Sequence, residues 1–486
     1  MTTTTATTDT TATFHERDHL YLGGRWEDAD GRGGVSEVVE AATEQVMGRV
    51  PQAGSSDVDR AVAAARAAFP AWSQTPVGER AELLSAMGAG LATRTDEIAT
   101  LVSREVGTPK NLSVLIHAGL PMLTLAHAAE LVASYPFEAE AFPSLVVREP
   151  VGVVAAIIPW NYPVHQAVAK VAWALAAGST VVLKPSEVAP LSAFVLAEIA
   201  EGAGLPAGVL NVVTGPGRVV GDALVAHTAV DMVSFTGSTN VGRRVGAVAA
   251  RSVKRVALEL GGKSANVILD DAPLDQAVPD GVAKCFLNAG QTCSALTRML
   301  VPRAALAEVE ALAAEAAATY VPGDPFAPET TLGPLASLAQ RDRVRAAIRR
   351  AVDEGATLVT GGPSAPEGLS RGYFVRPTVF SGVTPEMAIA RKEVFGPVLA
   401  ILAYDSEDEA VDMANDSDYG LSGGVWSGDP ERALAVARRL RTGQVEINGA
   451  MFNPRAPFGG YKQSGNGREL GAAGLEEFLE TKAIQR

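Results

Sequence analysis

The feature that most constrains this chain is an alternation of short apolar segments with helix-like segments, which begins at residue 151. The run from Val151 to Pro159 is short and continuously apolar, which is typical of a strand buried on both faces of a sheet. The following segments read in turn as helix 164–177, strand 179–183, helix 190–201, strands 209–213 and 232–235, helix 241–250 and strand 255–260. This order predicts βαβ units around a parallel sheet, with ligands bound where the strands end.

The alternation restarts near Ala265 and predicts a second α/β domain. A strand is expected over 266–269, and helices are expected over 274–289, 304–319, 344–354, 407–415 and 432–439. Ahead of the first sheet, the pattern predicts a helix over 55–73 with Ser56 as its N-cap, and a helical stretch over 77–107. The segment 144–148 could be a β-extension.

Charge and hydropathy exclude two classes of partner. The chain has 486 residues, enough for two or three domains, and its 41 basic and 55 acidic side chains give a formal net charge of −14. Nucleic acids and anionic membrane surfaces need a basic face, so neither is an expected partner. No run of 18 apolar residues is found, because His165, Gln166 and Lys170 interrupt the longest candidate, 164–183. A transmembrane helix is therefore not expected.

The N-terminus and the cysteine count indicate the compartment. The first 13 residues are rich in Thr and lack the basic start and apolar segment of a secretory signal, so a disordered tail is expected over 1–14. The two cysteines, Cys285 and Cys293, are too few for a disulfide scaffold, which favours a cytoplasmic location. The six histidines show no paired metal-ligand spacing, and no protein-ligated metal is expected.

The segment 261–264, Gly-Gly-Lys-Ser, ends like a phosphate-binding loop. That motif requires a glycine where this chain has Ala257, so a nucleoside triphosphatase is not favoured. Glu259, just before it, ends an apolar strand beside two glycines. A carboxylate in such a place is costly unless it is paired or functional.

Two other segments are candidates for binding a dinucleotide. Gly215-Pro216-Gly217 with Gly221 is one residue longer than the dinucleotide fingerprint, and an ordinary glycine-rich turn is the commoner occurrence. The segment 235–239, which contains Gly237 and Ser238, follows a strand and opens a helix. Free amides, the helix dipole and the Ser238 hydroxyl would favour an anion there, although Ser238 could equally be a helix cap.

Two more places carry polar or nucleophilic groups. Lys184 and Glu187 lie just past an expected strand and could bind a ribose, whereas a solvated ion pair is the commoner arrangement. Cys293 lies in the loop 288–294, where a nucleophile can be exposed, and Cys285 lies among apolar residues, as a core cysteine does. Neither His nor Lys adjoins Cys293, so any activation of its thiol must come from across the fold.

Taken in order, these segments resemble the NAD(P)-dependent aldehyde dehydrogenase superfamily. The resemblance extends over nearly the whole chain after its first residues. It rests on the motifs Pro159-Trp160-Asn161-Tyr162-Pro163, Leu183-Lys184-Pro185-Ser186-Glu187, Phe235-Thr236-Gly237-Ser238-Thr239, Leu258-Glu259-Leu260-Gly261-Gly262-Lys263, Gly290-Gln291-Thr292-Cys293, Glu393-Val394-Phe395-Gly396-Pro397 and Pro457-Phe458-Gly459-Gly460-Tyr461-Lys462-Gln463-Ser464-Gly465.

The resemblance implies an aldehyde oxidation through a cysteine thiohemiacetal and thioester. Cys293 is expected as the nucleophile, with the Asn161 amide and the Cys293 backbone N–H as the oxyanion hole. Glu259 is expected as the general base for the water that releases the acid. Lys170 and Glu469 match positions of a proton-relay or supporting hydrogen-bond network.

The resemblance also implies cofactor contacts. The expected cofactor-binding residues are Trp160, Lys184, Glu187, Gly217, Gly237, Ser238, Glu393 and Phe395. Glu187 would accept a hydrogen bond from the ribose and repel a 2′-phosphate, so NAD is favoured over NADP. Lys184 could offset that repulsion, which keeps NADP as the alternative cofactor.

In this family a Rossmann-like cofactor domain, an α/β catalytic domain and a small β-oligomerisation arm form an α/β fold. The expected bounds are 15–130 and 149–261 for the cofactor domain, 262–460 for the catalytic domain, and 131–148 with 478–486 for the arm. Homodimers or homotetramers are expected, formed when one strand extends a neighbour's sheet.

The substrate is a small-molecule aldehyde whose tunnel, by resemblance, draws on Tyr162, His165 and Phe452. Ala169 is small, which suggests a roomy entrance, and His165 and Arg455 could meet a polar or anionic tail or simply face solvent. Three other functions are alternatives: a CoA-acylating semialdehyde dehydrogenase, an inert structural protein on the same scaffold, and a thiol hydrolase. Glu259 favours water over CoA, and Cys293, Glu259 and Asn161 together argue against an inert protein. A thiol hydrolase would need a His partner that the sequence does not reveal.

Overall fold

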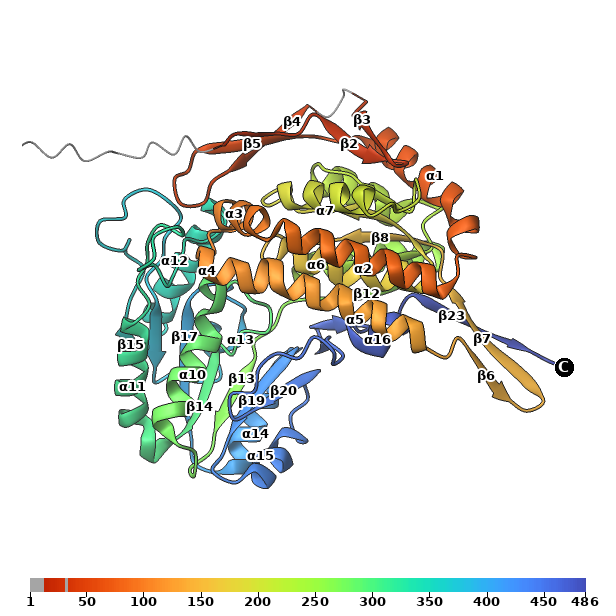
Figure 1. Cartoon of the computed structure of the whole chain (residues 1–486). Helices are drawn as coiled ribbons and strands as arrows, with labels where there is room; N and C mark the ends of the chain where they lie inside the picture. Colours follow the sequence, from red (N-terminus) through yellow and green to blue (C-terminus); the bar gives the residue numbers. More distant parts are fainter. Residues whose placement is uncertain (1–12, 31–33) are drawn as a thin grey trace, which may run out of the picture.

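The computed structural model describes residues 13–30 and 34–486, and this part of the chain forms two large sheets and a small projecting arm (Figure 1). Nearly all of the tail expected over 1–14 lies outside the described residues. A three-stranded sheet of β1 (His15–Glu16), β5 (Val46–Pro51) and β4 (Val35–Val39) lies at the N-terminal edge.

The first large sheet has eight strands in the order β22-β12-β11-β8-β9-β10-β2-β3. Its parallel centre consists of β12 (Arg255–Glu259), β11 (Met232–Thr236), β8 (Val153–Ile157), β9 (Thr180–Lys184) and β10 (Leu210–Val212). Each of these strands was predicted, so the parallel sheet is confirmed. Antiparallel strands close the two edges, with β2 (His19–Leu22) and β3 (Arg25–Asp28) at one and β22 (Gly465–Asn466) at the other.

Alternate residues of the central strands face two different cores. Val154 and Ala156 of β8 join one hydrophobic cluster, and Val153 and Ala155 join the other. The first cluster is covered by α2 (Val77–Thr93), α5 (Leu120–Ser134), α6 (Pro163–Ala177) and α7 (Leu191–Gly202), and the second by α1 (Ser55–Trp72), α8 (Asp222–Ala226) and α9 (Thr239–Ala249). Burial on both faces explains why these strands are continuously apolar.

Two expectations for the N-terminal helices were wrong. Ser56 is not the N-cap of α1, because Gly54 occupies that position and its N–H donates to the Asp57 carboxylate at 2.8 Å. The stretch 77–107 is two helices, α2 and α3 (Thr95–Val106), because the backbone leaves helical geometry at Arg94, where φ is −113°. The helix α4 (Lys110–Ser113) and a π-helical segment (Val114–Gly119) then lead into α5.

The second sheet has seven strands in the order β15-β16-β17-β14-β13-β19-β20. They are β15 (Thr357–Thr360), β16 (Thr378–Ser381), β17 (Val398–Tyr404), β14 (Arg298–Pro302), β13 (Ala265–Ile268), β19 (Ser422–Trp426) and β20 (Gln444–Ile447). All of its pairings are parallel except that of β15. Only β13 was predicted as a strand.

Helices flank this sheet, five of them close to predicted positions. They are α10 (Leu274–Phe286), α11 (Leu306–Ala318), α12 (Leu338–Asp353), α13 (Ala388–Arg391), α14 (Glu407–Asn415) and α15 (Pro430–Ala437). Helix α12 begins six residues earlier than expected, and the short α13 was not predicted. The helix expected over 274–289 ends early, at Phe286, because residues 288 and 289 adopt left-handed backbone angles.

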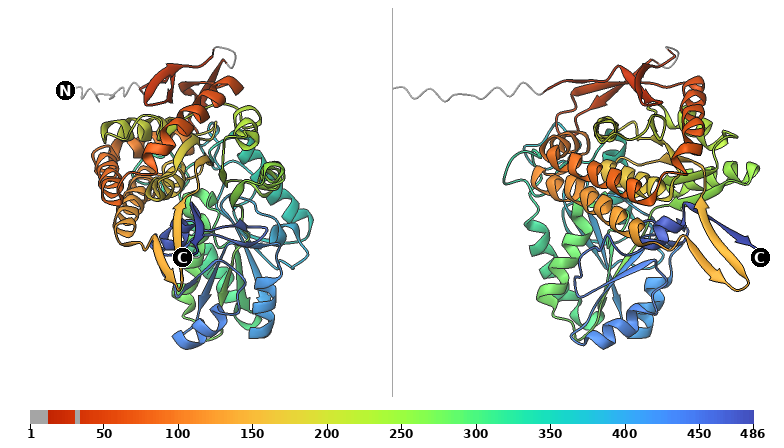
Figure 2. Two further views of the ribbon diagram at one scale, coloured as in Figure 1. Left: turned by 90° about the vertical axis from the view of Figure 1, so that its right-hand side faces the viewer. Right: turned by 45° about the vertical axis from the view of Figure 1, so that its right-hand side comes forward.

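The arm is a three-stranded antiparallel sheet of β23 (Leu479–Ile484), β7 (Ser144–Pro150) and β6 (Glu138–Ala141). Figure 2 shows it projecting from the body of the molecule, with the C-terminus at its end. Outside the arm, β18 (Tyr419–Gly420) pairs with β21 (Tyr461–Lys462), and α16 (Gly471–Glu476) precedes β23 in the chain.

One helical stretch, Lys110–Ser134, is long and apolar enough to cross a membrane by length and composition alone. The apolar pattern of the sequence did not single it out. Half of its most apolar window is buried inside the protein, and the stretch packs on α2 and α6. These contacts are those of a core helix.

Candidate active site

Cys293 lies in the loop between α10 of the second domain and β14. Three residues ahead of it have positive φ angles, with 53° at Asn288, 55° at Ala289 and 71° at Gly290. A Cβ added at Gly290 would lie 2.1 Å from the carbonyl oxygen of Gly396, so only glycine fits at this position. This tight turn brings Cys293 to the edge of the first sheet.

Asn161 lies between β8 and α6 and is hydrogen-bonded to the cysteine loop in both directions. Its side-chain amide donates to the Gln291 carbonyl at 2.8 Å. Its own carbonyl accepts from the Asn288 side chain at 3.0 Å. The buried Asn161 amide is therefore fixed two residues from Cys293.

The surroundings of Cys293 disfavour a thiolate. Burial, together with the negative charges of Glu259, Glu393 and Glu469, raises the pKa of the Cys293 thiol to about 12. The Cys293 carbonyl faces Gly262, where an added Cβ would lie 2.7 Å away. At neutral pH the thiol is protonated unless a positive charge is brought near.

Glu259 ends β12, and both of its carboxylate oxygens are buried without a hydrogen-bond partner. Burial raises the pKa of Glu259 well above its usual range, and the negative charge of Glu469 adds to this effect while Lys170 opposes it. An unpartnered buried carboxylate is costly to the fold, and such groups concentrate at functional sites.

Lys170 and Glu469 form a buried ion pair close to Glu259. The Lys170 ammonium contacts the Glu469 carboxylate and also donates to the Thr236 hydroxyl at 2.6 Å. Lys170 comes from α6 and Thr236 ends β11, so the pair joins the helix to the end of the sheet that carries Glu259.

The N-terminus of α9 offers uncommitted donors. Ser238 is the N-cap, but its hydroxyl makes no capping hydrogen bond, and the buried hydroxyl of Thr239 has no hydrogen-bond partner. A Cβ added at Gly237 would lie 2.6 Å from the Phe235 ring, so glycine is needed where the strand turns into the helix. Free amides and hydroxyls at a helix N-terminus suit an anionic group such as a pyrophosphate.

Glu187 and Lys184 do not form the solvated ion pair that was the alternative for these two residues. The exposed Glu187 carboxylate accepts from the Gly217 N–H at 2.6 Å. Lys184 is buried and donates to the Pro185 carbonyl at 2.8 Å, and burial lowers its pKa to about 8. Gly217 thus orients the carboxylate, which can still accept a further hydrogen bond.

Glu393, Phe395 and Trp160 form a group beside Gly261 and Gly262. The Glu393 carboxylate accepts from the Gly262 N–H at 3.1 Å, and burial raises its pKa to about 7. Phe395 has a φ of 58°, and its ring stands edge-on to Trp160 with 5.4 Å between centroids. These contacts place the aromatic pair next to a carboxylate near Cys293.

The three predicted substrate residues have different surroundings. The Tyr162 hydroxyl is hydrogen-bonded to the Thr292 hydroxyl at 2.8 Å. The His165 ring stands edge-on to Phe452 with 6.5 Å between centroids, and burial lowers its pKa to about 4. His165 is buried, so the alternative that it faces solvent was wrong. The neutral ring offers no charge to an anionic tail, but its buried Nδ1 has no hydrogen-bond partner and could still meet a polar one.

Arg455 is exposed, as one of its two alternatives had it, whereas Ala169 differs from expectation. The Arg455 guanidinium pairs with the Glu130 carboxylate at 2.7 Å, so its charge is not free for an anionic tail. Ala169 is buried in the core around α6 and does not lie at an open entrance.

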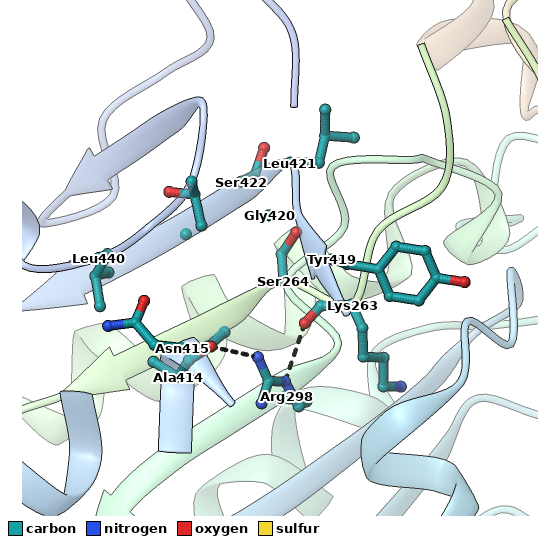
Figure 3. A pocket seen from close by; sticks show the side chains of 13 residues that line it. Lys263, Ser264, Arg298, Ala414, Asn415, Tyr419, Gly420, Leu421, Ser422 and Leu440 are labelled. Carbon is teal, nitrogen blue, oxygen red and sulfur yellow. Dashed lines mark hydrogen bonds between the residues drawn. The ribbon is translucent and has the colours of Figure 1, made fainter. Parts of the chain in front are cut away.

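A small cavity is lined in part by Lys263 and Ser264 of the segment that resembles a phosphate loop (Figure 3). It has a volume of about 10 Å³, room for about one water and not a phosphate. Arg298 donates to the Lys263 carbonyl at 2.9 Å and to the Met413 and Ala414 carbonyls at 2.8 Å each. Lys263 is buried, and its pKa is lowered to about 8 by that burial. The Gly-Gly-Lys-Ser segment is therefore a packed turn.

The structure brings the predicted residues together in two groups. The first group surrounds the Cys293 thiol and consists of Asn161, Lys170, Glu259 and Glu469, with Glu393 beside them. Lys184, Glu187 and Gly217, expected at the adenosine end, and Ser238, expected at the pyrophosphate, lie at the end of β9 and in the turns after β9, β10 and β11. Among residues 13–30 and 34–486, no group of three or more His, Cys, Asp or Glu side chains could hold a metal ion.

Sequence reasoning missed the supports of the cysteine loop. The Thr108 hydroxyl donates to the Asn288 side chain at 2.5 Å, and the Ala336 N–H donates to the Gln291 side chain at 2.9 Å. Asn288 and Gln291 belong to the loop that carries Cys293, so they could have been singled out. Thr108 lies 180 residues away from Asn288 and carries no local signal.

Comparisons with known proteins give one consistent result. The model of the aldehyde dehydrogenase family matches residues 26–484. The chain is 51% identical over 471 residues to a 3-succinoylsemialdehyde-pyridine dehydrogenase from a Pseudomonas species, covering 96% of this chain and 98% of that one. A cysteine-to-alanine mutant of a Pseudomonas syringae aldehyde dehydrogenase, crystallised with NAD+ and octanal, has a TM-score of 0.96 at 49% identity, covering 96% of both chains. A Mycobacterium tuberculosis aldehyde dehydrogenase crystallised with NAD+ has a TM-score of 0.95 at 44% identity, covering 98% of this chain and 99% of that one.

Proposed function

Because the chain belongs to the aldehyde dehydrogenase family and oxidises an aldehyde to the acid with NAD, we propose that Cys293 is the nucleophile of this reaction. The observation that carries the proposal is the convergence of the Asn161 amide and the carboxylates of Glu259 and Glu393 around the Cys293 thiol. The first sheet supplies Asn161 and Glu259, and the second domain supplies Cys293 and Glu393.

The proposed first step is attack of the Cys293 thiolate on the aldehyde carbon, which turns the carbonyl oxygen into an oxyanion. Asn161 uses one side-chain N–H on the Gln291 carbonyl, which leaves its second N–H for the oxyanion, beside the Cys293 backbone N–H. When bound, NAD accepts the hydride that leaves the former aldehyde carbon. Cys293 then carries the acyl group as a thioester.

Glu259 is the proposed general base for release of the acid. It takes a proton from the water that attacks the thioester, and the Cys293 thiolate leaves. Its oxygens are not held by other donors, so they are available to a water. Lys170 and Glu469 would pass that proton onward or support the charge on Glu259, a role consistent with their ion pair beside it.

The residues present suit NAD along its whole length. The proposed contacts are Ser238 and the first turn of α9 with Gly237 for the pyrophosphate, Lys184 and Glu187 with Gly217 for the adenosine ribose, and Glu393, Phe395 and Trp160 for the nicotinamide end. The Glu187 carboxylate would repel a 2′-phosphate, which supports NAD over NADP, and Lys184 offsets that repulsion only where it is charged.

The proposed substrate class is an uncharged aldehyde with an apolar body. His165 is neutral at neutral pH and contacts the Phe452 ring, and the Arg455 charge is paired with Glu130. Neither His165 nor Arg455 therefore offers an unpaired positive charge to a carboxylate on the substrate. The Pseudomonas syringae relative was crystallised with octanal, which belongs to this class.

Hydrolysis is favoured over transfer to CoA because Glu259 supplies a base for water.

A homodimer or homotetramer in the cytoplasm is proposed as the working state. The arm supports association, since it carries Phe142 with 95% of its surface exposed, and the two free cysteines suit a reducing compartment.

Replacement of Cys293 by Ala tests the proposal. Cys293→Ala should abolish NADH formation with octanal while leaving the Kd for NAD within about twofold, because the thiol makes the bond to substrate and not to the cofactor. NADH absorbance and cofactor fluorescence titration measure the two effects. Cys285→Ala, which removes the other, fully buried thiol, is the matched control. Full activity of Cys293→Ala would refute the mechanism.

A further inference from the structure

Thr108 and His117 form a buried polar pair that the proposed mechanism does not use. Their side chains have at most 1% of their surface exposed. The Thr108 hydroxyl lies 3.0 Å from Nε2 of His117 and 2.5 Å from the side-chain oxygen of Asn288. A buried pair of this kind at the base of the cysteine loop needs a physical role.

The hydrogen bonds of this pair have one direction. Thr108 donates its only proton to Asn288, so His117 must donate from Nε2 to the Thr108 oxygen. Burial lowers the pKa of His117 to about 3, which keeps the ring neutral with a single N–H. The tautomer with the proton on Nε2 is the one that completes both hydrogen bonds.

The chain of donors continues to the oxyanion hole. With its oxygen bound by Thr108, the Asn288 side chain directs its amide to the Asn161 carbonyl at 3.0 Å. Asn161 in turn directs its amide to the Gln291 carbonyl at 2.8 Å. Thr108 therefore fixes the Asn288 side chain, Asn288 holds the main-chain carbonyl of Asn161, and the Asn161 side chain is bound to the loop that carries Cys293.

The same chain holds a strained turn. Asn288 and Ala289 have φ angles of 53° and 55°, and each non-glycine residue in this region costs about 1 kcal/mol or more. The Asn288 carbonyl accepts from the Gln291 side chain at 3.2 Å and from the Gln291 N–H at 3.0 Å. The main chain of Asn288 is thus held by Gln291, and its side-chain oxygen is held by Thr108.

We propose that Thr108, backed by His117, is a positioning residue that orients the Asn161 amide toward the oxyanion through Asn288. Loss of its hydroxyl frees the Asn288 amide to rotate and leaves the Asn161 amide misaligned with the reacting oxygen. The proposal rests on the oxyanion role proposed above for Asn161.

Thr108→Val removes the hydroxyl and keeps the shape of the side chain. With octanal and NAD, kcat should fall about tenfold or more, less than the ~10²–10³ expected for removing an oxyanion donor, while the KM for NAD stays within about twofold. Thr108→Ser keeps the hydroxyl and should restore kcat to within about threefold of the natural enzyme.

Thr124→Val is the matched control. Thr124 is also fully buried, and its hydroxyl donates to the Leu120 carbonyl within α5, away from the cysteine loop. This variant should lose a comparable amount of thermal stability and keep its kcat. An equal fall in kcat in Thr124→Val would overturn the proposal, because the effect would then be one of stability alone. A serine variant as impaired as the valine variant would overturn it too.

A double-mutant cycle separates this inference from the proposed mechanism. In an Asn161→Ala background, Thr108→Val should lower kcat by less than about twofold, because the group it orients is gone. If Asn161→Ala alone leaves kcat unchanged, the oxyanion role is wrong and this inference falls with it. If Asn161→Ala lowers kcat but Thr108→Val does not, only this inference is overturned.

Discussion

At the scale of single residues, the thiol of Cys293 is a group whose reactive thiolate form the fold alone does not stabilise. Burial and three carboxylates hold its pKa near 12, so the protein alone disfavours the reactive form. The nicotinamide ring of NAD is cationic, and a nearby positive charge lowers a thiol pKa. Bound NAD would therefore lower the pKa of the Cys293 thiol and favour its thiolate.

We therefore expect NAD to accelerate alkylation of Cys293. At pH 7.5, iodoacetamide should modify Cys293 slowly in the free enzyme and at least about tenfold faster with saturating NAD, since the thiolate is the reacting form. Without NAD the rate should rise with pH throughout the range in which the protein is stable. Cys285, which is fully buried, serves as the internal control in peptide mass spectrometry and should stay unmodified. An NAD-independent rate would contradict this role of the cofactor.

Glu259 leads to a second prediction at this scale. Glu259→Gln should slow steady-state turnover about 100-fold, as for loss of a general base, and leave a rapid burst of NADH, because thioester formation precedes the step that needs the base. The pKa of Glu259 is raised, so the carboxylate forms only as pH rises through that pKa, and kcat of the natural enzyme should rise with it.

The glutamine variant should lack this rise of kcat with pH. Stopped-flow absorbance resolves the burst from the steady state. Lys254→Gln, a change in a lysine that donates to the carbonyls of His227 and Val230 away from the thiol, is a suitable control and should keep the pH profile. Loss of the burst in Glu259→Gln would contradict the role in deacylation.

The sequence points to the residues proposed to do chemistry more readily than to those that hold them in place. Cys293, Glu259 and Asn161 could be found because each lies in a short motif with a chemical reason for its residue type. Thr108 could not, because its role depends on a contact across 180 residues, and threonine is common at buried positions that have no part in a reaction. The sequence left open whether His165 faces solvent, because burial, which sets its charge, is a property of the fold.

At the scale of elements, the strands of the first sheet were predictable and those of the second were largely not. β17 is apolar along all of its length, a pattern that a buried helix shares. β19 contains Gly423 and Gly424, which read as a turn. The structure explains these glycines, since a Cβ added at Gly424 would lie 2.8 Å from the Asn266 side chain. The sequence of a single segment does not reveal how tightly it packs against neighbouring elements.

The turn after α10 gives a prediction at this scale. Gly290→Ala should destabilise the protein by about 2 kcal/mol or more and reduce kcat, because the added methyl overlaps the Gly396 carbonyl and the turn carries Cys293. Thermal unfolding and NADH absorbance measure the two effects.

Gly355→Ala is the control that separates overlap from backbone strain. Gly355 also has a positive φ, 94°, but an added Cβ meets nothing within 4 Å. Its variant should lose about 1 kcal/mol and keep its kcat. Equal losses in the two variants would show that contact with Gly396 does not matter.

At the scale of the whole molecule, we expect the arm to act through contact with another copy of the chain. Phe142 lies between β6 and β7 with 95% of its surface exposed. Phe142→Ser should leave the fold of the subunit unchanged and weaken association about tenfold or more, because burying an aromatic side chain contributes a few kcal/mol. Sedimentation velocity over a dilution series measures the association. Val35→Ser, which changes an exposed valine in β4, is the control and should associate normally. Unchanged association of Phe142→Ser would count against the arm.

The path of the chain through the two large sheets has a consequence for how the proposed site can form. Asn161 and Glu259 come from the earlier half, and Cys293 and Glu393 from the later half. Neither half holds a nucleophile together with the groups that would make it useful. Separating the two halves would part Cys293 from Asn161 and Glu259, so the proposed site can exist only where both large sheets are folded against each other.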